Sequence, residues 1–253
     1  MPDLQDKLQQ QPEQSTVLGL PVHLLPRHLD WLLERLRLAQ GTHVVTLNAE
    51  MAIQAEQNPA LAQIIHQAEL VIPDGAGVVL YLQLWAGRRI ARCPGIELAA
   101  ALVQQAAEQP GSSILFYGSA PGVAQIAAER FQQQLPGLKI AGVQHGFLAA
   151  EDQPAFRQQL QQLQPSIILV GLGVPRQEFW IAENRHLCPH AIWIGVGGSF
   201  DIWAGTKDRA PEWLRDNHLE WTYRLYQEPW RWRRMLALPK FVWRSLLYQL
   251  TQP

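Results

Sequence analysis

From residue 41 onward, short apolar runs alternate with longer stretches of helical spacing, and this alternation constrains the fold more than any other feature. Runs rich in valine, isoleucine and leucine predict buried strands at 43–46, 70–72, 113–117, 138–143, 167–170 and 192–196. Apolar residues at helical spacing predict helices at 50–67, 96–108, 123–135, 154–163 and 177–186. Strands that are apolar throughout and separated by helices predict a Rossmann-like α/β fold, with a parallel sheet and helices on both faces.

The composition excludes several classes of protein. Hydrophobic residues make up 47% of the 253 residues and charged residues 17%, which is enough for a substantial core. The net charge of −1 gives no basic excess for nucleic acid. The polar N-terminus and the absence of a long apolar run predict neither signal peptide nor membrane span, so the protein is expected to be soluble or attached peripherally to a membrane. Cys93 and Cys188 follow no metal-binding or redox spacing and fit a reducing cytoplasm.

Three regions are expected along the chain. Residues 1–16 are Gln-rich and poor in apolar side chains, which predicts disorder. Residues 17–210 form the predicted Rossmann-like catalytic domain, and a short strand or hairpin is expected at 17–25. Residues 211–253 form a predicted helical appendage that is basic and rich in tryptophan.

The predicted appendage has the character of a membrane-proximal segment. Pro229 and Pro239 are expected to break it into short helices. In the last of these helices, one face carries Trp243, Leu246, Leu247 and Leu250. Basic and tryptophan-rich amphipathic helices suit the headgroup level of an anionic membrane. The alternative is that these aromatic residues pack on the main domain or on a partner subunit.

Polar and glycine residues follow several of the predicted strands. Thr46 and Asn48 follow one strand, and Asp74 with Gly75 follows the next. In open α/β sheets, ligands bind beyond the carboxyl ends of the strands, so Asp74 is a carboxylate at a candidate ligand-binding edge. The alternative is that Asp74-Gly75 forms a turn with no role in ligand binding.

Three further strands end in glycine-bearing loops, at residues 118–122, 171–178 and 197–201. The first two open predicted helices, whose N-terminal N–H groups could bind a phosphate. None of the three loops matches a complete dinucleotide fingerprint or a Walker loop. Taken together they indicate a phosphate-containing ligand, whereas each one alone could be a tight turn.

The sequence also lacks the usual metal-binding patterns. No Asp-X-Asp pair occurs, and no His, Cys or carboxylate cluster has metal-ligand spacing. If a diphosphate leaves during the reaction, its charge must then be met by arginine, lysine and helix N-termini. We therefore expect neither a metal nor an organic cofactor.

The ordered motifs resemble the WecG/TagA/CpsF family of bacterial glycosyltransferases, from about residue 18 to about residue 245. The resemblance is carried by the segments at 45–50, 73–78, 118–123, 145–147, 170–178, 195–201 and 219–224. It implies an inverting and metal-independent transfer of a hexose-type sugar, such as N-acetylmannosamine, from a UDP-sugar. The implied acceptor is a sugar on undecaprenyl diphosphate at the cytoplasmic face of the cell membrane, in the synthesis of a cell-surface polysaccharide.

The resemblance also implies roles for particular residues. The proposed base of the family matches Asp74, and its pocket positions match Thr46, Asn48, Arg92 and Gln177. The appendage is expected to supply Arg224 and Arg231, with Arg234 as a further candidate. From the strand-end loops we add the candidate substrate-binding glycines Gly75, Gly118, Gly171 and Gly173.

Two positions depart from the family pattern. Ile96-Glu97 stands where many members have a hydroxyl residue followed by Asp, which leaves the identity of donor and acceptor open. Arg176 stands where Lys is frequent, which keeps the charge but changes the hydrogen-bond geometry.

The expected partners are the UDP-sugar, the lipid-diphosphate-linked sugar and the membrane surface, and no nucleic acid. A homo-oligomer remains open. One alternative is a nucleotide-binding Rossmann oxidoreductase, although no GxGxxG follows the first strand of the sheet. The other is an inactive membrane-associated assembly protein of the same fold.

Overall fold

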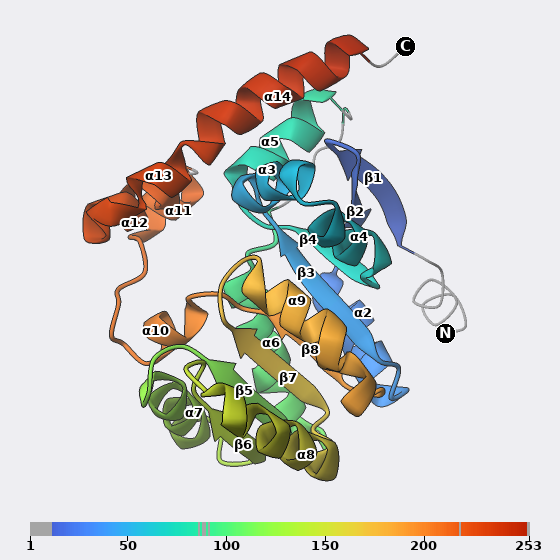
Figure 1. Cartoon of the computed structure of the whole chain (residues 1–253), viewed down its shortest axis with the longest axis vertical. Helices are drawn as coiled ribbons and strands as arrows, with labels where there is room; N and C mark the ends of the chain where they lie inside the picture. Colours follow the sequence, from blue (N-terminus) through green and yellow to red (C-terminus); the bar gives the residue numbers. More distant parts are fainter. Residues whose placement is uncertain (1–11, 86, 88–89, 91, 218, 252–253) are drawn as a thin grey trace.

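A computed structural model describes residues 12–85, 87, 90, 92–217 and 219–251, and the side chain of Arg231 lies outside this description. Six parallel strands form the central sheet in the order β4-β3-β8-β7-β5-β6 (Figure 1). In chain order these strands are β3 Thr42–Leu47, β4 Leu70–Pro73, β5 Ile114–Gly118, β6 Ile140–Gln144, β7 Ile167–Gly171 and β8 Ile192–Gly195. The predicted parallel sheet is confirmed, and each predicted strand matches an observed strand to within two residues at either end.

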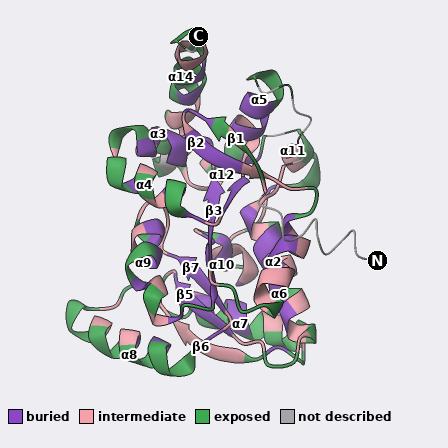
Figure 2. Ribbon diagram, turned by 90° about the vertical axis from the view of Figure 1, so that its right-hand side faces the viewer, coloured by how far each residue is buried: buried purple, intermediate pink, exposed green. Residues whose placement is uncertain are grey.

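Helices bury both faces of this sheet, as Figure 2 shows. One face packs on α2 His28–Arg37, α6 Gly95–Glu108, α7 Val123–Gln134 and α10 Ser199–Trp203. The other face packs on α3 Ala49–Gln57, α4 Pro59–Gln67, α5 Ala76–Trp85, α8 Gln153–Leu163 and α9 Arg176–Asn184. Within β3, Val44 belongs to the first of these cores and Val45 to the second. Burial on both sides explains why the strands are mostly apolar, although β3 also buries the polar residues Thr42 and His43.

The predicted helix 50–67 is two helices, α3 and α4. The Asn58 side chain accepts a hydrogen bond from the backbone N–H of Leu61 at 3.2 Å, and Pro59 is the first residue of α4. An asparagine cap followed by proline is a strong helix start, and it ends the preceding helix. Two 3₁₀ turns, η1 Ala150–Asp152 and η2 Arg185–Leu187, flank α8 and α9.

An N-terminal hairpin, β1 Glu13–Val17 and β2 Leu20–Leu24, packs beside the edge strand β4. The His23 ring accepts a hydrogen bond from the backbone N–H of Val71 at 2.8 Å. This contact satisfies a backbone donor that the edge strand β4 would otherwise leave unpaired. The hairpin was expected at 17–25, but β1 begins at Glu13, inside the segment predicted to be disordered. The rest of that segment, residues 1–11, lies outside the described residues.

Residues 212–251 form a series of helices that crosses from the carboxyl ends of the strands to α5 (Figure 1). They are α11 Glu212–Asp216, α12 Glu220–Gln227, η3 Pro229–Arg231, α13 Trp232–Met235 and α14 Ala237–Thr251. Pro229 begins η3, so the predicted break there is confirmed. The break predicted at Pro239 is wrong, because Pro239 stands in the first turn of α14, where a missing N–H breaks no helical hydrogen bond.

The last helix, α14, packs on the main domain through one face. Phe241 is buried with its ring 6.1 Å from that of Tyr81 on α5, and Gln249 Nε2 donates to the Tyr81 hydroxyl at 2.9 Å. Arg244 forms an ion pair with Glu56 of α3 at 2.9 Å. The appendage therefore completes part of the core.

The opposite face of α14 is open to solvent. Trp243, Leu246 and Leu250 are exposed there, whereas Leu247 is half-buried. The amphipathic face predicted from the sequence is thus present. Among the described helices, none is long and apolar enough to cross a bilayer.

Two glycines allow β5 and β7 to lie close together at their carboxyl ends. Gly118 has φ +137°, and a Cβ atom there would lie 2.4 Å from the carbonyl oxygen of Gly171. A Cβ atom on Gly171 would in turn lie 2.6 Å from the Phe200 ring. Both positions therefore require glycine for packing.

Candidate active site

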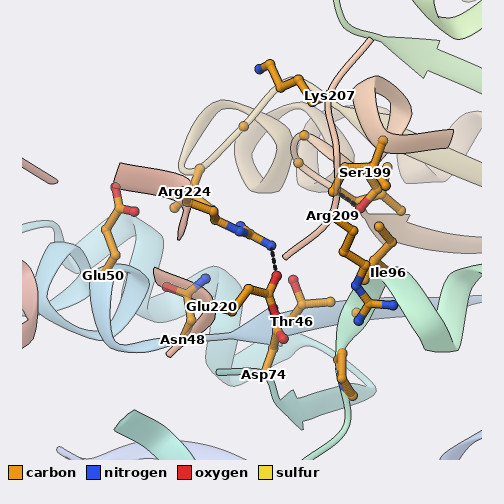
Figure 3. Close-up of a pocket in the computed structure, with 18 of the residues that line it drawn as sticks. Thr46, Asn48, Glu50, Asp74, Ile96, Ser199, Lys207, Arg209, Glu220 and Arg224 are labelled. Atoms are coloured by element: carbon orange, nitrogen blue, oxygen red, sulfur yellow. Dashed lines mark hydrogen bonds and ion pairs between the residues drawn. The ribbon is translucent and has the colours of Figure 1, made fainter. Parts of the chain in front are cut away.

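A cavity lies beyond the carboxyl ends of β3, β4, β7 and β8 and is roofed by residues 207–210 and α12 (Figure 3). Strand β3 has β4, the next strand in the sequence, on one side and β8, the last strand of the sheet, on the other. Such a reversal of strand order leaves a crevice at the strand ends, which is where open α/β sheets bind ligands. The loops after all four strands contribute to the lining of the cavity.

Asp74 follows β4 and stands in the wall of this cavity. Its backbone N–H donates to the carbonyl of Leu47 on β3 at 2.9 Å, which fixes the loop, and Gly75 continues it with φ +86°. Burial raises the pKa of the Asp74 carboxyl, while Arg92 and Arg224 act to lower it. The result is a carboxylate with raised proton affinity beside two cations.

Thr46 and Asn48 stand at the end of β3 on the floor of the cavity. The Thr46 hydroxyl donates weakly to the Gly195 carbonyl at 3.4 Å, across the gap between β3 and β8. Asn48 Oδ1 caps α3 by accepting from the backbone N–H of Met51 at 3.0 Å. Because the oxygen of Asn48 serves the helix, its NH₂ group is the part available to a ligand.

Gln177 joins the two glycine loops that follow β7 and β8. Its Oε1 accepts from the N–H groups of Gly173 at 3.2 Å and Gly197 at 3.0 Å. Its Nε2 donates to Glu178 at 2.8 Å, and the side chain is only 1% exposed. Gln177 therefore shapes the cavity mainly by holding these loops, and its amide is already occupied by protein partners.

Glu178 is a buried acid behind Gln177. Burial raises the pKa of the Glu178 carboxyl to about 7, and the hydrogen bond from Gln177 offsets this only in part. Its Oε2 has no hydrogen-bond partner within the described residues. An acid in such a place is most stable when it is protonated.

Arg92 and Arg224 reach the cavity from different parts of the chain, the loop before α6 and helix α12. Glu220 lies between them. Its Oε2 accepts from Arg92 Nη2 at 2.5 Å and its Oε1 from Arg224 Nη2 at 2.6 Å (Figure 3 draws the second contact). Burial would raise the pKa of Glu220, but Arg224 and Arg92 outweigh it and lower the value to about 2.

The sequence analysis did not single out Glu220 as a site residue. It lies within the motif at 219–224 and four residues before Arg224, a spacing that places two charged side chains on one helical face. Two further cations of the cavity were also missed. Lys207 donates a hydrogen bond to Glu228 at 3.1 Å, and Arg209 pairs with Glu97, one of the residues that depart from the family pattern.

The other predicted site residues are placed as follows. Gly173 lines the main cavity, whereas Gly75 lines a neighbouring one. Gly118 and Gly171 line neither, and their packing role was described above. Arg234 lines both cavities and pairs with Glu50 at 2.6 Å. Arg231 ends η3, and the position predicted for its side chain lies outside the described part of the chain.

The neighbouring cavity shares one wall with the first. The shared residues are Asn48, Glu50, Asp74, Arg92, Glu220, Arg224 and Arg234. From there it runs toward α13 and α14, along apolar residues that include Ala76, Trp221, Met235 and Leu238. Asp74 thus stands where a polar, cationic cavity meets a more apolar one.

No group of three or more His, Cys, Asp or Glu side chains that could hold a metal ion occurs within the described ranges. The cavity does contain arginine and lysine side chains next to one carboxylate of raised pKa. An α/β fold with such a cavity at its strand ends is typical of an enzyme, and the cations favour an anionic ligand.

Comparison with known proteins identifies the family. The family description "Glycosyl transferase WecG/TagA/CpsF family" matches residues 15–253, so the chain belongs to this family and is a glycosyltransferase. This finding confirms the resemblance stated from the motifs and decides against the oxidoreductase alternative.

Two similar proteins of Bacillus carry the same name, N-acetylglucosaminyldiphosphoundecaprenol N-acetyl-beta-D-mannosaminyltransferase. The protein of Bacillus spizizenii is 39% identical over 203 residues, which are 80% of this chain and 78% of the relative. That of Bacillus subtilis is 35% identical over 201 residues, which are 79% of this chain and 77% of the relative.

The burial of Glu178 leads to a prediction about stability and pH. Its pKa is raised in the folded state, so the folded protein binds more protons than the unfolded chain between about pH 4.5 and 7. Stability should therefore fall as the pH rises through this window, by up to about 3 kcal/mol. Glu178→Gln removes the titrating carboxyl group. The free energy of unfolding of the variant, measured against that of wild type, should therefore be more favourable at pH 8 than at pH 5.

Urea unfolding at the two pH values measures this difference. Glu183→Gln, on the exposed side of the same helix, is the matched control and should follow wild type. Equal pH dependence in Glu178→Gln and wild type would contradict a protonated, buried Glu178.

Proposed function

We propose that this glycosyltransferase moves an N-acetylmannosamine-type sugar from a UDP-sugar to a sugar carried on undecaprenyl diphosphate. The transfer inverts the anomeric centre and uses no metal ion. The observation that carries the proposal is the position of Asp74, in the wall shared by two cavities and beside Arg92 and Arg224. The names of the two Bacillus relatives indicate the transferred sugar and the lipid-linked acceptor.

The cavity at the strand ends suits the donor. Glycine loops after β7 and β8 let a ligand approach the backbone closely, at Gly173, Gly197 and Gly198. Arg92 and Arg224 supply positive charge for a diphosphate, since a guanidinium can bind phosphate oxygens through two parallel hydrogen bonds. These cations would take the part that a divalent metal plays in other sugar-nucleotide enzymes.

The neighbouring cavity suits the acceptor. Its apolar walls run toward α13 and α14, so a lipid-linked sugar could enter from that side and present a hydroxyl group to Asp74. Asp74 would take the proton of this hydroxyl while the oxygen bonds to the anomeric carbon. On the opposite face of the sugar, the bond to the diphosphate breaks and UDP leaves with the electron pair.

The electrostatics of Asp74 fit this role. A general base works best when its pKa approaches the working pH, and burial raises the pKa of Asp74 in that direction. The developing charge on UDP would be stabilised by Arg92 and Arg224, which are held in place before the substrate binds. One carboxylate and two arginines therefore account for both proton removal and departure of the leaving group.

The exposed apolar side chains suit contact with a membrane. Trp243, Leu246 and Leu250 lie on the outer face of α14, and Leu84 and Trp85 are exposed on the adjacent α5. Tryptophan and leucine beside basic residues favour the headgroup level of an anionic bilayer. We propose that this surface holds the enzyme peripherally on the cytoplasmic face of the cell membrane, where a lipid-linked acceptor is found.

A direct assay tests the proposed reaction. The enzyme should transfer sugar from UDP-N-acetylmannosamine to a lipid-diphosphate-linked N-acetylglucosamine, with release of UDP and a product identified by mass. Activity should persist in excess EDTA, because arginines rather than a metal meet the charge of the leaving group. Failure to transfer from any UDP-sugar would contradict the proposal and favour the inactive assembly protein, and loss of activity in EDTA that Mn²⁺ restores would contradict metal independence.

Asp74→Asn tests the base. Turnover should fall by about 10²–10⁴, the usual contribution of a positioned general base, because the amide cannot accept the proton. UDP binding should change little, since the asparagine keeps the shape of the side chain. Asp216→Asn removes an exposed carboxylate on α11 and is the control, with turnover expected at the wild-type level. Near-wild-type turnover of Asp74→Asn would exclude Asp74 as the base.

The outer face of α14 is tested without disturbing its packing. Replacing Trp243, Leu246 and Leu250 together by serine should weaken co-sedimentation with anionic vesicles by at least about tenfold, because these side chains bury apolar surface in the bilayer. The melting temperature and UDP binding should stay near wild type, since all three side chains are exposed. Ile126→Ser, on the exposed side of α7, is the control for loss of a surface apolar residue. Undiminished vesicle binding by the triple variant would exclude this face as the contact.

A further inference from the structure

Glu220 connects two parts of the chain at the cavity. It is the first residue of α12 and is 6% exposed, and its two carboxylate oxygens bind different arginines. Arg92 comes from the main domain, whereas Arg224 comes from α12 itself. In the Arg92–Glu220 pair both side chains are largely buried, which distinguishes it from the Arg234–Glu50 and Arg244–Glu56 pairs, whose arginines are more exposed.

The need for Glu220 follows from the charges around it. Two guanidinium groups that converge on one carboxylate repel each other, and this repulsion is least screened by water on the side of the largely buried Arg92, since Arg224 is half-exposed. A carboxylate between them offsets the repulsion and fixes the position of each group through a charge-assisted hydrogen bond. Asp74 also attracts both arginines, but among the described hydrogen bonds Glu220 is the group that binds Arg92 and Arg224 together.

The same contacts leave donors available for a ligand. Each arginine uses one terminal nitrogen on Glu220, whereas a guanidinium carries five N–H donors. Arg92 Nε is buried and has no hydrogen-bond partner in the described part of the chain. Because both arginines line both cavities, the terminal nitrogens that Glu220 does not use are the donors available to an anion there.

We infer that Glu220 is a positioning residue that holds Arg92 and Arg224 in a fixed pair for the diphosphate of the sugar donor. The inference rests on the proposed function and names a group that acts through other residues. Glu220 also lies close enough to Asp74 for its negative charge to counter the two arginines there. Glu220 thereby attaches α12 to the main domain, fixes the positions of Arg92 and Arg224, and helps to keep the pKa of Asp74 raised.

Glu220→Gln tests the inference with UDP as the probe. The glutamine keeps the size of the side chain but removes the charge, and its NH₂ group opposes one of the arginines. We expect the Kd for UDP to rise by about tenfold, which corresponds to the loss of one charge-assisted hydrogen bond, and kcat to fall. The acid limb of the kcat profile should move to lower pH, because Arg92 and Arg224 then lower the pKa of Asp74 without opposition from Glu220.

Two other variants test whether Glu220 positions the two arginines or only attaches the C-terminal helices to the main domain. Glu56→Gln breaks the Arg244–Glu56 pair between α14 and α3, away from both cavities, and should leave UDP affinity and the pH profile unchanged. Glu220→Asp keeps the charge and should bind UDP more tightly than Glu220→Gln but less tightly than wild type. If Glu220→Gln does not fold, Glu220→Asp decides, with a Kd for UDP expected about threefold above wild type.

The outcomes are distinct. If Glu220→Gln matches Glu56→Gln in UDP affinity and in pH profile, Glu220 only attaches the appendage and the inference is wrong. An unchanged Kd and kcat in Glu220→Asp, when Glu220→Gln is unfolded, would also overturn it. If wild-type protein neither binds UDP nor transfers sugar, the proposed function itself fails, and this result is recognised before any variant is compared.

Discussion

Burial of both faces of the parallel sheet is the constraint on which the rest of the structure depends. Side chains along the strands alternate between two apolar cores, so the sheet faces leave no room for chemistry. The polar side chains of the cavity therefore stand where the strands end, among them Thr46, Asn48 and Asp74. The strand order then selects which ends are open, because β3 and β8 are neighbours although they are far apart in the chain.

The C-terminal helices supply what these strand ends lack. The strand ends contribute a carboxylate and backbone donors, whereas α12 contributes Arg224 and Glu220. Because Glu220 also binds Arg92 of the main domain, closure of the cavity and assembly of its charges depend on the same contact. The appendage is therefore part of the site as well as part of the apolar outer surface.

Local patterns predicted most of this architecture, because strand apolarity and helical spacing depend on near neighbours in the sequence. The features that the sequence did not predict depend on where a residue stands within a helix or on which strands are neighbours. Pro239 was expected to break a helix, but it stands in a first turn, which tolerates proline. At the site, Asp74 and Arg224 follow from motifs, whereas the role of Gln177 as a link between two loops requires knowing that β7 and β8 are adjacent. Glu220 was missed for the same reason, since its partner Arg92 lies 128 residues away.

The packing of α14 on α5 bears on how such enzymes can be recombined. Helix α5 begins just after Asp74-Gly75, and its Tyr81 contacts both Phe241 and Gln249 of the final helix. A chimaera that exchanged only residues 211–253 for those of a relative would place foreign side chains against Tyr81, on the helix that begins just after Asp74 and Gly75. Helix α14 also packs on α3, where Arg244 pairs with Glu56. The natural unit of exchange is therefore the terminal helices together with α3 and α5, which are far from them in the sequence but adjacent in space.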